Sequence, residues 1–267
     1  MSFFKSLILF TLPMYYSLHT RYKGITGIFA WLTKYLIPCF FIALCCEDFS
    51  LLLFVLGLFY VYEFYEMGYI QNDCETIKKE LHPTMRLSPA ELIAYEKWKY
   101  LIVIIRIAET AILASCLYML GVRWQLLVFY AFTYVIFVFY NTIRNGFCLV
   151  VHVVLMMMRY TAPVYLSANV ESFWIAVLLF LTYPLTLYVE RAVKGKFGYR
   201  SKLLTKFVLS SYEGRYVFRI KYYCALTFLL IAAVCFAGAP FMSLVPVLVL
   251  LASSVMTYKN EKLQYNK

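Results

Sequence analysis

Long apolar stretches alternate with short polar joints along most of this 267-residue chain. A helix needs about 20 apolar residues to cross the hydrocarbon core of a bilayer, which is about 30 Å thick. Stretches of this kind predict eight spans, at residues 25–46, 50–70, 100–120, 123–140, 147–168, 171–189, 219–237 and 240–257. Because backbone groups in lipid must be satisfied within each span, the pattern predicts an all-α polytopic membrane protein.

The composition agrees with this pattern and removes the soluble alternatives. Hydrophobic residues make up 63% of the chain and charged residues 15%, with a mean hydropathy of +0.74. A soluble domain carries about 25% charged residues, so a soluble globular enzyme, a disordered chain and a coiled coil are excluded. We therefore expect residues 1–267 to form a single transmembrane domain. Residues 3–18 are short and interrupted by Pro13, which predicts an interfacial helix within an N-terminal segment, 1–24.

The net charge of +11 is unevenly placed along the chain. Twenty-one of the 25 Lys and Arg residues fall in the two termini and in the segments 71–99, 141–146 and 191–221. The positive-inside rule places such segments in the cytoplasm, and an even number of spans agrees with this. We therefore expect both termini to be cytoplasmic, together with two long loops, 71–99 and 191–219. These loops are the places to look for chemistry.

Polar side chains cluster where the second predicted span ends. If that helix continues past residue 70, Asp73 and Glu80 share one face and Asn72 lies on the neighbouring stripe. Mg²⁺ typically binds one or two carboxylates together with the phosphates of a ligand. Asn72, Asp73 and Glu80 are therefore candidate metal ligands, with Lys78 beside them as a candidate phosphate contact. The competing interpretation is a solvated helix end whose acidic residues pair with its lysines.

The same run resembles a known motif. Asn72-Asp73, Glu80, His82-Pro83 and Arg86 are similar to the pattern N-D-x-x-D-x-x-x-D followed by H-P-x-x-R. That pattern is the first signature of the UbiA-type intramembrane prenyltransferase superfamily. The resemblance is closest to the branch that synthesises decaprenylphosphoryl-phosphoribose. The chain departs from the pattern where Thr76 and Glu80 replace two of the aspartates, and where the His-Pro pair arrives one residue early.

Two further stretches resemble the same branch. Residues 140–163 are similar to a segment with a tyrosine, a basic turn and a late Met-Arg, which makes Arg144 and Arg159 candidate phosphate contacts. The second loop is similar to a K-R-x-x-E … R-x-x-L … Y pattern, with Glu190 and Lys194 exchanged. From the three stretches together, the resemblance implies these substrate-binding residues: Asn72, Lys78, His82, Arg86, Arg144, Arg159, Arg191, Arg200 and Tyr212.

The resemblance also implies a fold and an activity. The superfamily has a bundle of usually nine spans around a cavity, so we expect eight to nine helices here. Its chemistry is substitution at a carbon that bears diphosphate, with Mg²⁺ on the diphosphate and Asp73 and Glu80 in the catalytic role. In this branch phosphoribose passes from phosphoribosyl diphosphate to a polyprenyl phosphate for cell-surface polysaccharide synthesis. We accordingly expect membrane lipids and phosphorylated substrates as partners, no nucleic acid, and a bacterial inner-membrane location.

Two other functions remain open. Thr76 and the exchanged Glu190 and Lys194 favour a non-catalytic relative that binds or transports a polyprenyl phosphate. A prenyltransferase acting on an aromatic acceptor ranks third. It needs a second aspartate-rich motif after the sixth span, and residues 186–215 contain no aspartate.

Charged residues inside predicted spans need partners, because isolated charges are costly in lipid. Arg106 and Glu109 are three residues apart on the third span and are predicted to pair with each other. Glu63 and Glu66 on the second span have two candidate partners, Arg159 and Arg106.

Overall fold

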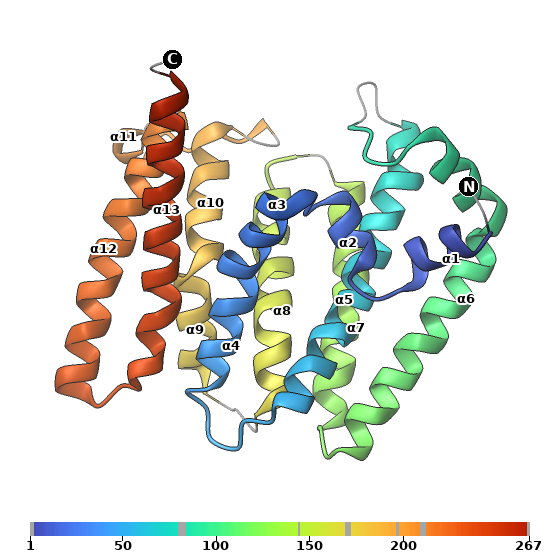
Figure 1. The fold of residues 1–267 in the computed structure, drawn as a ribbon, viewed down its shortest axis with the longest axis horizontal. Helices are drawn as coiled ribbons and strands as arrows, with labels where there is room; N and C mark the ends of the chain where they lie inside the picture. The colour runs from blue at the N-terminus through green and yellow to red at the C-terminus, as the bar shows by residue number, and fades with distance from the viewer. Residues whose placement is uncertain are drawn as a thin grey trace.

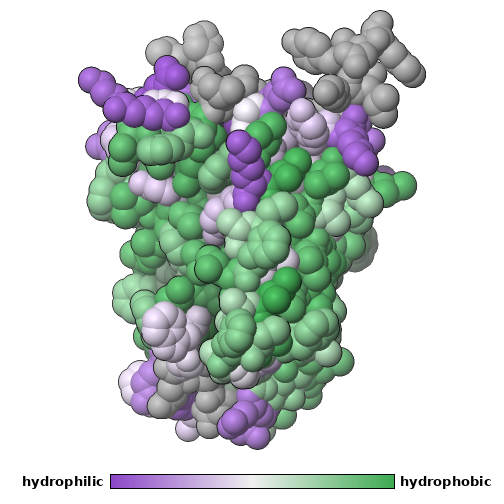
Figure 2. All heavy atoms as spheres, turned by 90° about the vertical axis from the view of Figure 1, so that its left-hand side faces the viewer, coloured by the Kyte–Doolittle hydropathy of each residue, from purple (hydrophilic) through white to green (hydrophobic). Residues whose placement is uncertain are grey.

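The computed structural model describes residues 3–79, 84–143, 145–168, 172–195, 198–208 and 212–265. All regular secondary structure in these residues is helical, which confirms the all-α prediction. Seven of the described helices are long and apolar enough to span a membrane, and a bent pair makes an eighth if it counts as one span. Figure 2 shows a hydrophobic belt between two hydrophilic ends, as a multi-pass membrane protein requires.

The helices follow one another up and down the bundle (Figure 1). The first span joins α3 (Gly24–Trp31) to α4 (Ile37–Ala43) through a π-helical turn. The bent pair, with 50° between its halves, is α9 (Phe173–Leu181) and α10 (Tyr183–Lys194). The other spans are α5 (Leu51–Cys74), α6 (Pro89–Met119), α7 (Trp124–Thr142), α8 (Cys148–Ser167), α12 (Tyr212–Ala237) and α13 (Leu244–Tyr265).

Helix α5 is the centre of the larger part of the bundle, because α6, α7 and α8 all pack against it. Gly68 allows the close approach of α7, since a Cβ atom at that position would lie 2.2 Å from Cγ of Phe137. Gly57 similarly faces Leu166 of α8. The α12–α13 hairpin forms one edge of the molecule and reaches the bundle mainly through α13 and α4 (Figure 1).

Several helices extend further than the apolar pattern predicts. Helix α6 begins at Pro89, eleven residues before the predicted span, because Ser88 and Glu91 form a capping box that stabilises its first turn. Helix α5 continues to Cys74, and α12 begins at Tyr212 rather than at residue 219. Much of the two predicted loops is therefore helical. The polar turns of these helices lie at one end of the bundle, where α5, α7 and α10 finish; this end is called the loop end below (Figure 1).

The N-terminal residues form two short helices, α1 (Phe3–Thr11) and α2 (Tyr15–Thr20), which together are called the N-terminal hairpin. The hairpin turns at Pro13, which cannot continue a helix, and at Met14, whose φ is +68°. Its turn lies against the middle of α5 and α6 in Figure 1. Glu66 of α5 accepts hydrogen bonds from the backbone N–H groups of Met14 (3.1 Å) and Ser17 (2.6 Å).

Buried charges hold this arrangement together. The Arg106 guanidinium forms ion pairs of 2.8 Å with both Glu63 and Glu66, and its Nε donates to the Phe10 carbonyl at 2.8 Å. All three charged side chains are at most 1% exposed. Arg106 thus pairs with the two glutamates of α5 rather than with Glu109, because they approach it from the helix that packs beside α6. Of the two partners predicted for Glu63 and Glu66, Arg106 is confirmed.

Replacement of Arg106 by Gln is expected to destabilise the protein severely. The substitution leaves two buried carboxylates without a cation, and breaking a buried pair in this way costs about 3–5 kcal/mol. The melting temperature of the purified protein in detergent measures the effect. Arg123→Gln, at an exposed arginine at the opposite end of the bundle, is the control. Equal melting temperatures for the two variants would contradict the prediction.

Candidate functional site

A cavity of 380 Å³ lies at the loop end of the bundle, lined by residues of α5, α7, α8 and α10. Its lining includes three arginines, Arg21, Arg86 and Arg191. Tyrosine, asparagine and histidine side chains complete most of its polar surface. The part of this lining that the structure describes contains no carboxylate, so its charge is positive.

One wall is organised by Asp73, whose side chain is 1% exposed and lies directly behind the cavity surface. Arg21 binds it with two hydrogen bonds, Nη1 to Oδ2 at 2.6 Å and Nη2 to Oδ1 at 3.0 Å. Arg86 donates to Oδ1 at 3.0 Å, and so does the amide of Asn72. The Tyr16 hydroxyl donates to Oδ2 at 2.9 Å. Asp73 therefore positions two guanidinium groups at the cavity.

Two of these donors, Tyr16 and Arg21, lie outside the membrane-spanning helices, and both keep their protons. Burial raises the pKa of the Tyr16 hydroxyl, and the neighbouring Asp73 carboxylate raises it further. Burial by itself lowers the pKa of Arg21, but its hydrogen bonds and charge attraction to Asp73 outweigh this and leave the pKa above its ordinary value. Arg21 consequently carries a full positive charge, and Tyr16 stays a hydrogen-bond donor.

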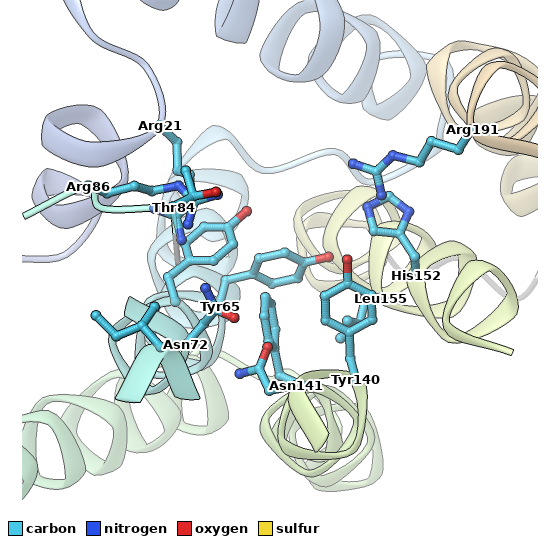
Figure 3. Close-up of a pocket in the computed structure, with 13 residues that line it drawn as sticks. Arg21, Tyr65, Asn72, Thr84, Arg86, Tyr140, Asn141, His152, Leu155 and Arg191 are labelled. Carbon is cyan, nitrogen blue, oxygen red and sulfur yellow. The ribbon is translucent and has the colours of Figure 1, made fainter. Parts of the chain in front are cut away.

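The opposite wall carries a second positive group. Figure 3 shows Arg191 of α10 beside His152 of α8, across the cavity from Arg21 and Arg86. Nη1 of Arg191 is buried and has no hydrogen-bond partner. A buried donor without a partner is costly, so this group is suited to an anionic ligand.

Polar and aromatic side chains lie between the two positive walls. Tyr65, Tyr140 and Asn141 point into this middle region in Figure 3. The amide of Asn141 donates to the Gly68 carbonyl (3.0 Å) and to Gln71 (3.1 Å), whereas its buried carbonyl oxygen has no partner. Tyr69 lies under Arg21, with 4.4 Å between Cζ and the ring centroid. This region offers hydroxyl and amide groups to a polar ligand.

Arg159, predicted as a phosphate contact, lies behind the cavity and does not line it. Its Cζ is 4.1 Å from the ring centroid of Tyr35 and 4.9 Å from that of Tyr62. It donates hydrogen bonds to the hydroxyls of Tyr22 (2.9 Å) and Tyr62. Within the described residues no carboxylate forms an ion pair with it, so stacking on tyrosine rings takes that place.

The structure brings some of the predicted residues together and separates others. Asn72, Arg86 and Arg191 line the cavity, and Asp73 supports it. Lys78 instead pairs with Glu75 and Glu96 on the exposed surface. Two other predicted residues lie away from the cavity lining, Arg159 and the exposed Arg200. Glu80, His82 and Arg144 lie outside the described residues, as does the side chain of Tyr212.

The cavity is also lined by residues that were not predicted for the site: Arg21, Tyr65, Tyr69, Asn141 and His152. A signal existed for the two tyrosines of α5, because residues 65, 69 and 72 recur at helical spacing and so share the face that carries Asn72. Arg21 gave no local signal beyond its charge. Its role depends on the folding back of the N-terminal hairpin against α5.

The described residues do not fit a magnesium site. They contain no group of three His, Cys, Asp or Glu side chains that could hold a metal ion. Both oxygens of Asp73 already accept hydrogen bonds from cationic donors. Moreover, α5 ends at Cys74 and Thr76–Lys79 form a 3₁₀ turn, so the α-helix does not continue through the described residues that follow Asp73. The donor set present suits an anion instead.

Comparison with known proteins adds no identity: no protein-family model, curated protein or solved structure matches the chain. The geometry of the cavity therefore carries the functional argument.

Replacement of Arg191 by Gln is expected to weaken the binding of inorganic diphosphate to the purified protein about tenfold or more. A hydrogen bond to a charged group contributes about 1.5–3 kcal/mol, and 1.4 kcal/mol corresponds to a factor of ten. Isothermal titration calorimetry measures the affinity, with Arg123→Gln as the control at the opposite end of the bundle. Equal affinity in the two variants would contradict an anion site at Arg191.

Diphosphate binding is also expected to persist in the presence of a chelator. The arginines supply the positive charge, and the described residues offer no metal site. The same titration with and without EDTA checks this. Binding that requires added Mg²⁺ would show that a metal, rather than the arginines alone, holds the anion.

Proposed function

We propose that this chain is an intramembrane transferase that moves a phosphorylated sugar from a diphosphate-bearing donor to a polyprenyl phosphate. One observation carries the proposal: two positive groups face each other across a polar cavity at the loop end of a membrane bundle. A donor such as phosphoribosyl diphosphate carries negative charge at both ends of a hydroxylated ring, and this arrangement matches that distribution.

Each wall of the cavity has a role in the proposal. Arg21 and Arg86, held in place by Asp73, bind the diphosphate of the donor. Guanidinium groups bind phosphate oxygens through two parallel hydrogen bonds, and their charge is most effective where water is excluded. Arg191, with His152 beside it, binds the phosphate at the other end of the sugar. The tyrosines and asparagines between the walls bind the hydroxyl groups of the sugar.

The proposed reaction is a substitution at the sugar carbon that bears the diphosphate. The bond from this carbon to the diphosphate oxygen breaks, and the diphosphate leaves with the bonding electron pair. An oxygen of the polyprenyl phosphate forms the new bond to the same carbon. Negative charge develops on the leaving diphosphate, where Arg21 and Arg86 stabilise it in the transition state.

The resemblance of the Asn72–Arg86 run to the UbiA-type superfamily supports this proposal. Residues of that run form the Asp73 wall of the cavity. The resemblance further implies a requirement for Mg²⁺, which stays a prediction because the described residues do not fit such a site. The bacterial inner membrane, the cytoplasmic orientation of the loop end and the role in cell-surface polysaccharide synthesis belong to the same proposal.

A second function is favoured by a specific observation. The described lining contains no carboxylate, and Asp73 is committed to two arginines, so the described residues offer no free carboxylate in the cavity to act as a base or a metal ligand. A non-catalytic relative that binds a polyprenyl phosphate requires only the positive walls.

Replacement of Asp73 by Asn is expected to reduce transfer about 100-fold or more. The change removes the charge that orients Arg21 and Arg86, and a misplacement of about 1 Å at a reacting centre costs about this much. Membranes that contain the protein are incubated with labelled phosphoribosyl diphosphate and polyprenyl phosphate, and label in the lipid fraction is counted. Arg123→Gln serves as the control.

The same assay separates the two functions. No label in lipid from this donor or from any prenyl diphosphate, while the purified protein still binds polyprenyl phosphate, would reject the transferase and support the binding protein. Repeating the assay with a chelator tests the requirement for Mg²⁺.

A further inference from the structure

A second polar cluster lies apart from the cavity, at the middle of the bundle, where α5, α6 and the N-terminal hairpin meet. Three carboxyl groups, those of Glu63, Glu66 and Glu109, interact electrostatically around the single guanidinium of Arg106. If all were ionised, three negative charges would face one positive charge. Two like charges in a buried site of low dielectric constant do not both ionise at small cost.

The hydrogen bonds distinguish Glu66 from Glu63. Both oxygens of Glu66 accept hydrogen bonds: Oε1 from the Ser17 N–H, and Oε2 from the Met14 N–H and from Arg106. Both oxygens of Glu66 are therefore already engaged. Glu63 accepts only one hydrogen bond, from Arg106 to Oε2. Its Oε1 is buried and has no partner, and the side chain is 0% exposed.

Glu109 contributes a second carboxylate oxygen without a hydrogen-bond partner. Its Oε2 is buried and also has no hydrogen-bond partner. These are the two carboxylate oxygens in this state among the described residues. Among the described residues, Arg106 is the cation that interacts with this cluster. The hairpin contributes backbone groups of Phe10, Met14 and Ser17, and Tyr134 of α7 lines a cavity together with Arg106.

We propose that Glu63 and Glu109 form a binding site for one exchangeable monovalent cation, a proton or Na⁺, within the membrane-spanning bundle. The cation occupies the unpartnered oxygens and removes the excess negative charge around Arg106. A proton and Na⁺ share the same chemistry here, because each places a single positive charge on a carboxylate oxygen. This site is separate from the arginine-lined cavity and does not depend on the proposed transferase activity.

A cavity of 170 Å³ reaches the Arg106 side of the cluster and is lined by Arg106, Gln71 and Glu75 among others. The Glu75 side chain is 39% exposed. Polar groups therefore extend from Arg106 toward the loop end of the bundle.

Occupancy of the site affects the N-terminal hairpin. Loss of the cation leaves Glu63 ionised, which adds repulsion against Glu66 and competes with it for Arg106. Glu66 and Arg106 bind the hairpin, and the hairpin in turn carries Tyr16 and leads into Arg21, both of which bind Asp73. The charge state of the cluster is thus connected to the arginine-lined wall of the cavity.

Glu63→Gln, which keeps the shape of the side chain and removes its charge, provides the test in the full chain. Infrared difference spectroscopy of the purified protein in lipid nanodiscs detects the C=O band of a protonated carboxyl group. If the cation is a proton, wild type shows this band and Glu63→Gln loses it, whereas Glu47→Gln, at an exposed glutamate between α4 and α5, retains it. If the cation is Na⁺, added Na⁺ raises the melting temperature of wild type at constant pH and ionic strength.

The melting temperature separates the outcomes further. In wild type without Na⁺ the melting temperature is expected to fall by about 3 °C or more as the pH is raised. A proton bound in the folded state stabilises that state at the lower pH values where it stays bound, and this stabilisation is lost at the higher pH values where the proton is released. Glu63→Gln is expected to lack this fall. Glu109→Gln gives the same loss of dependence if Glu63→Gln does not fold. A pH and Na⁺ dependence in both variants equal to that of wild type, with an unchanged carboxyl band, would overturn the proposal.

Discussion

The need to pair charged side chains inside an apolar bundle determines how this protein is built. Arg106, Glu63 and Glu66 are almost completely buried, and the guanidinium of Arg106 forms ion pairs with both carboxyl groups. Glu66 and Arg106 also form hydrogen bonds with backbone groups of the N-terminal hairpin. The hairpin is therefore held between α5 and α6 by charge, in addition to the apolar contacts of Leu9, Phe10 and Tyr16.

The arginine-lined cavity depends on this placement. Asp73 lies two turns of α5 beyond Glu66. It binds Tyr16, which belongs to the hairpin, and Arg21, which directly follows the hairpin. One helix thus carries two anionic positions, and both bind the same N-terminal segment. Glu66 fixes the turn of the hairpin, and Asp73 binds Arg21 directly on the wall opposite Arg191. Positioning groups at a site need rigid support of this kind if their hydrogen bonds are to be directed at a ligand.

The structure also changes the kind of ligand that the Asn72–Arg86 run is suited to bind. At the level of sequence, the run offers oxygen ligands next to basic residues, which is compatible with a metal bound to a phosphate ligand. In the folded chain the basic residues themselves bind the carboxylate, and the resulting wall presents guanidinium groups to the cavity. The difference arises because Arg21, distant in sequence, reaches Asp73 from the N-terminal side. Arg21, Arg86 and Arg191 thus line the cavity as its charged groups.

The amino-acid sequence by itself determined the helical class, the approximate positions of the spans and the concentration of basic residues at one end. Each depends on local quantities, namely the length of an apolar stretch and the charge of the residues that follow it. The resemblance of three stretches to the UbiA-type branch also implied Asn72, Arg86 and Arg191 as site residues, and these three line the cavity. Helix ends were less well predicted, since the capping box of Ser88 and Glu91 extends α6 beyond its apolar part.

Only the tertiary structure decided which charges meet. Arg106 has candidate partners on its own helix and on α5, and the packing of α5 against α6 selects Glu63 and Glu66. The same packing makes Arg21 part of the cavity and leaves Arg159 behind it among tyrosines. Pairing of this kind depends on distances of 3–4 Å between segments far apart in sequence, and no local pattern of residues encodes such distances.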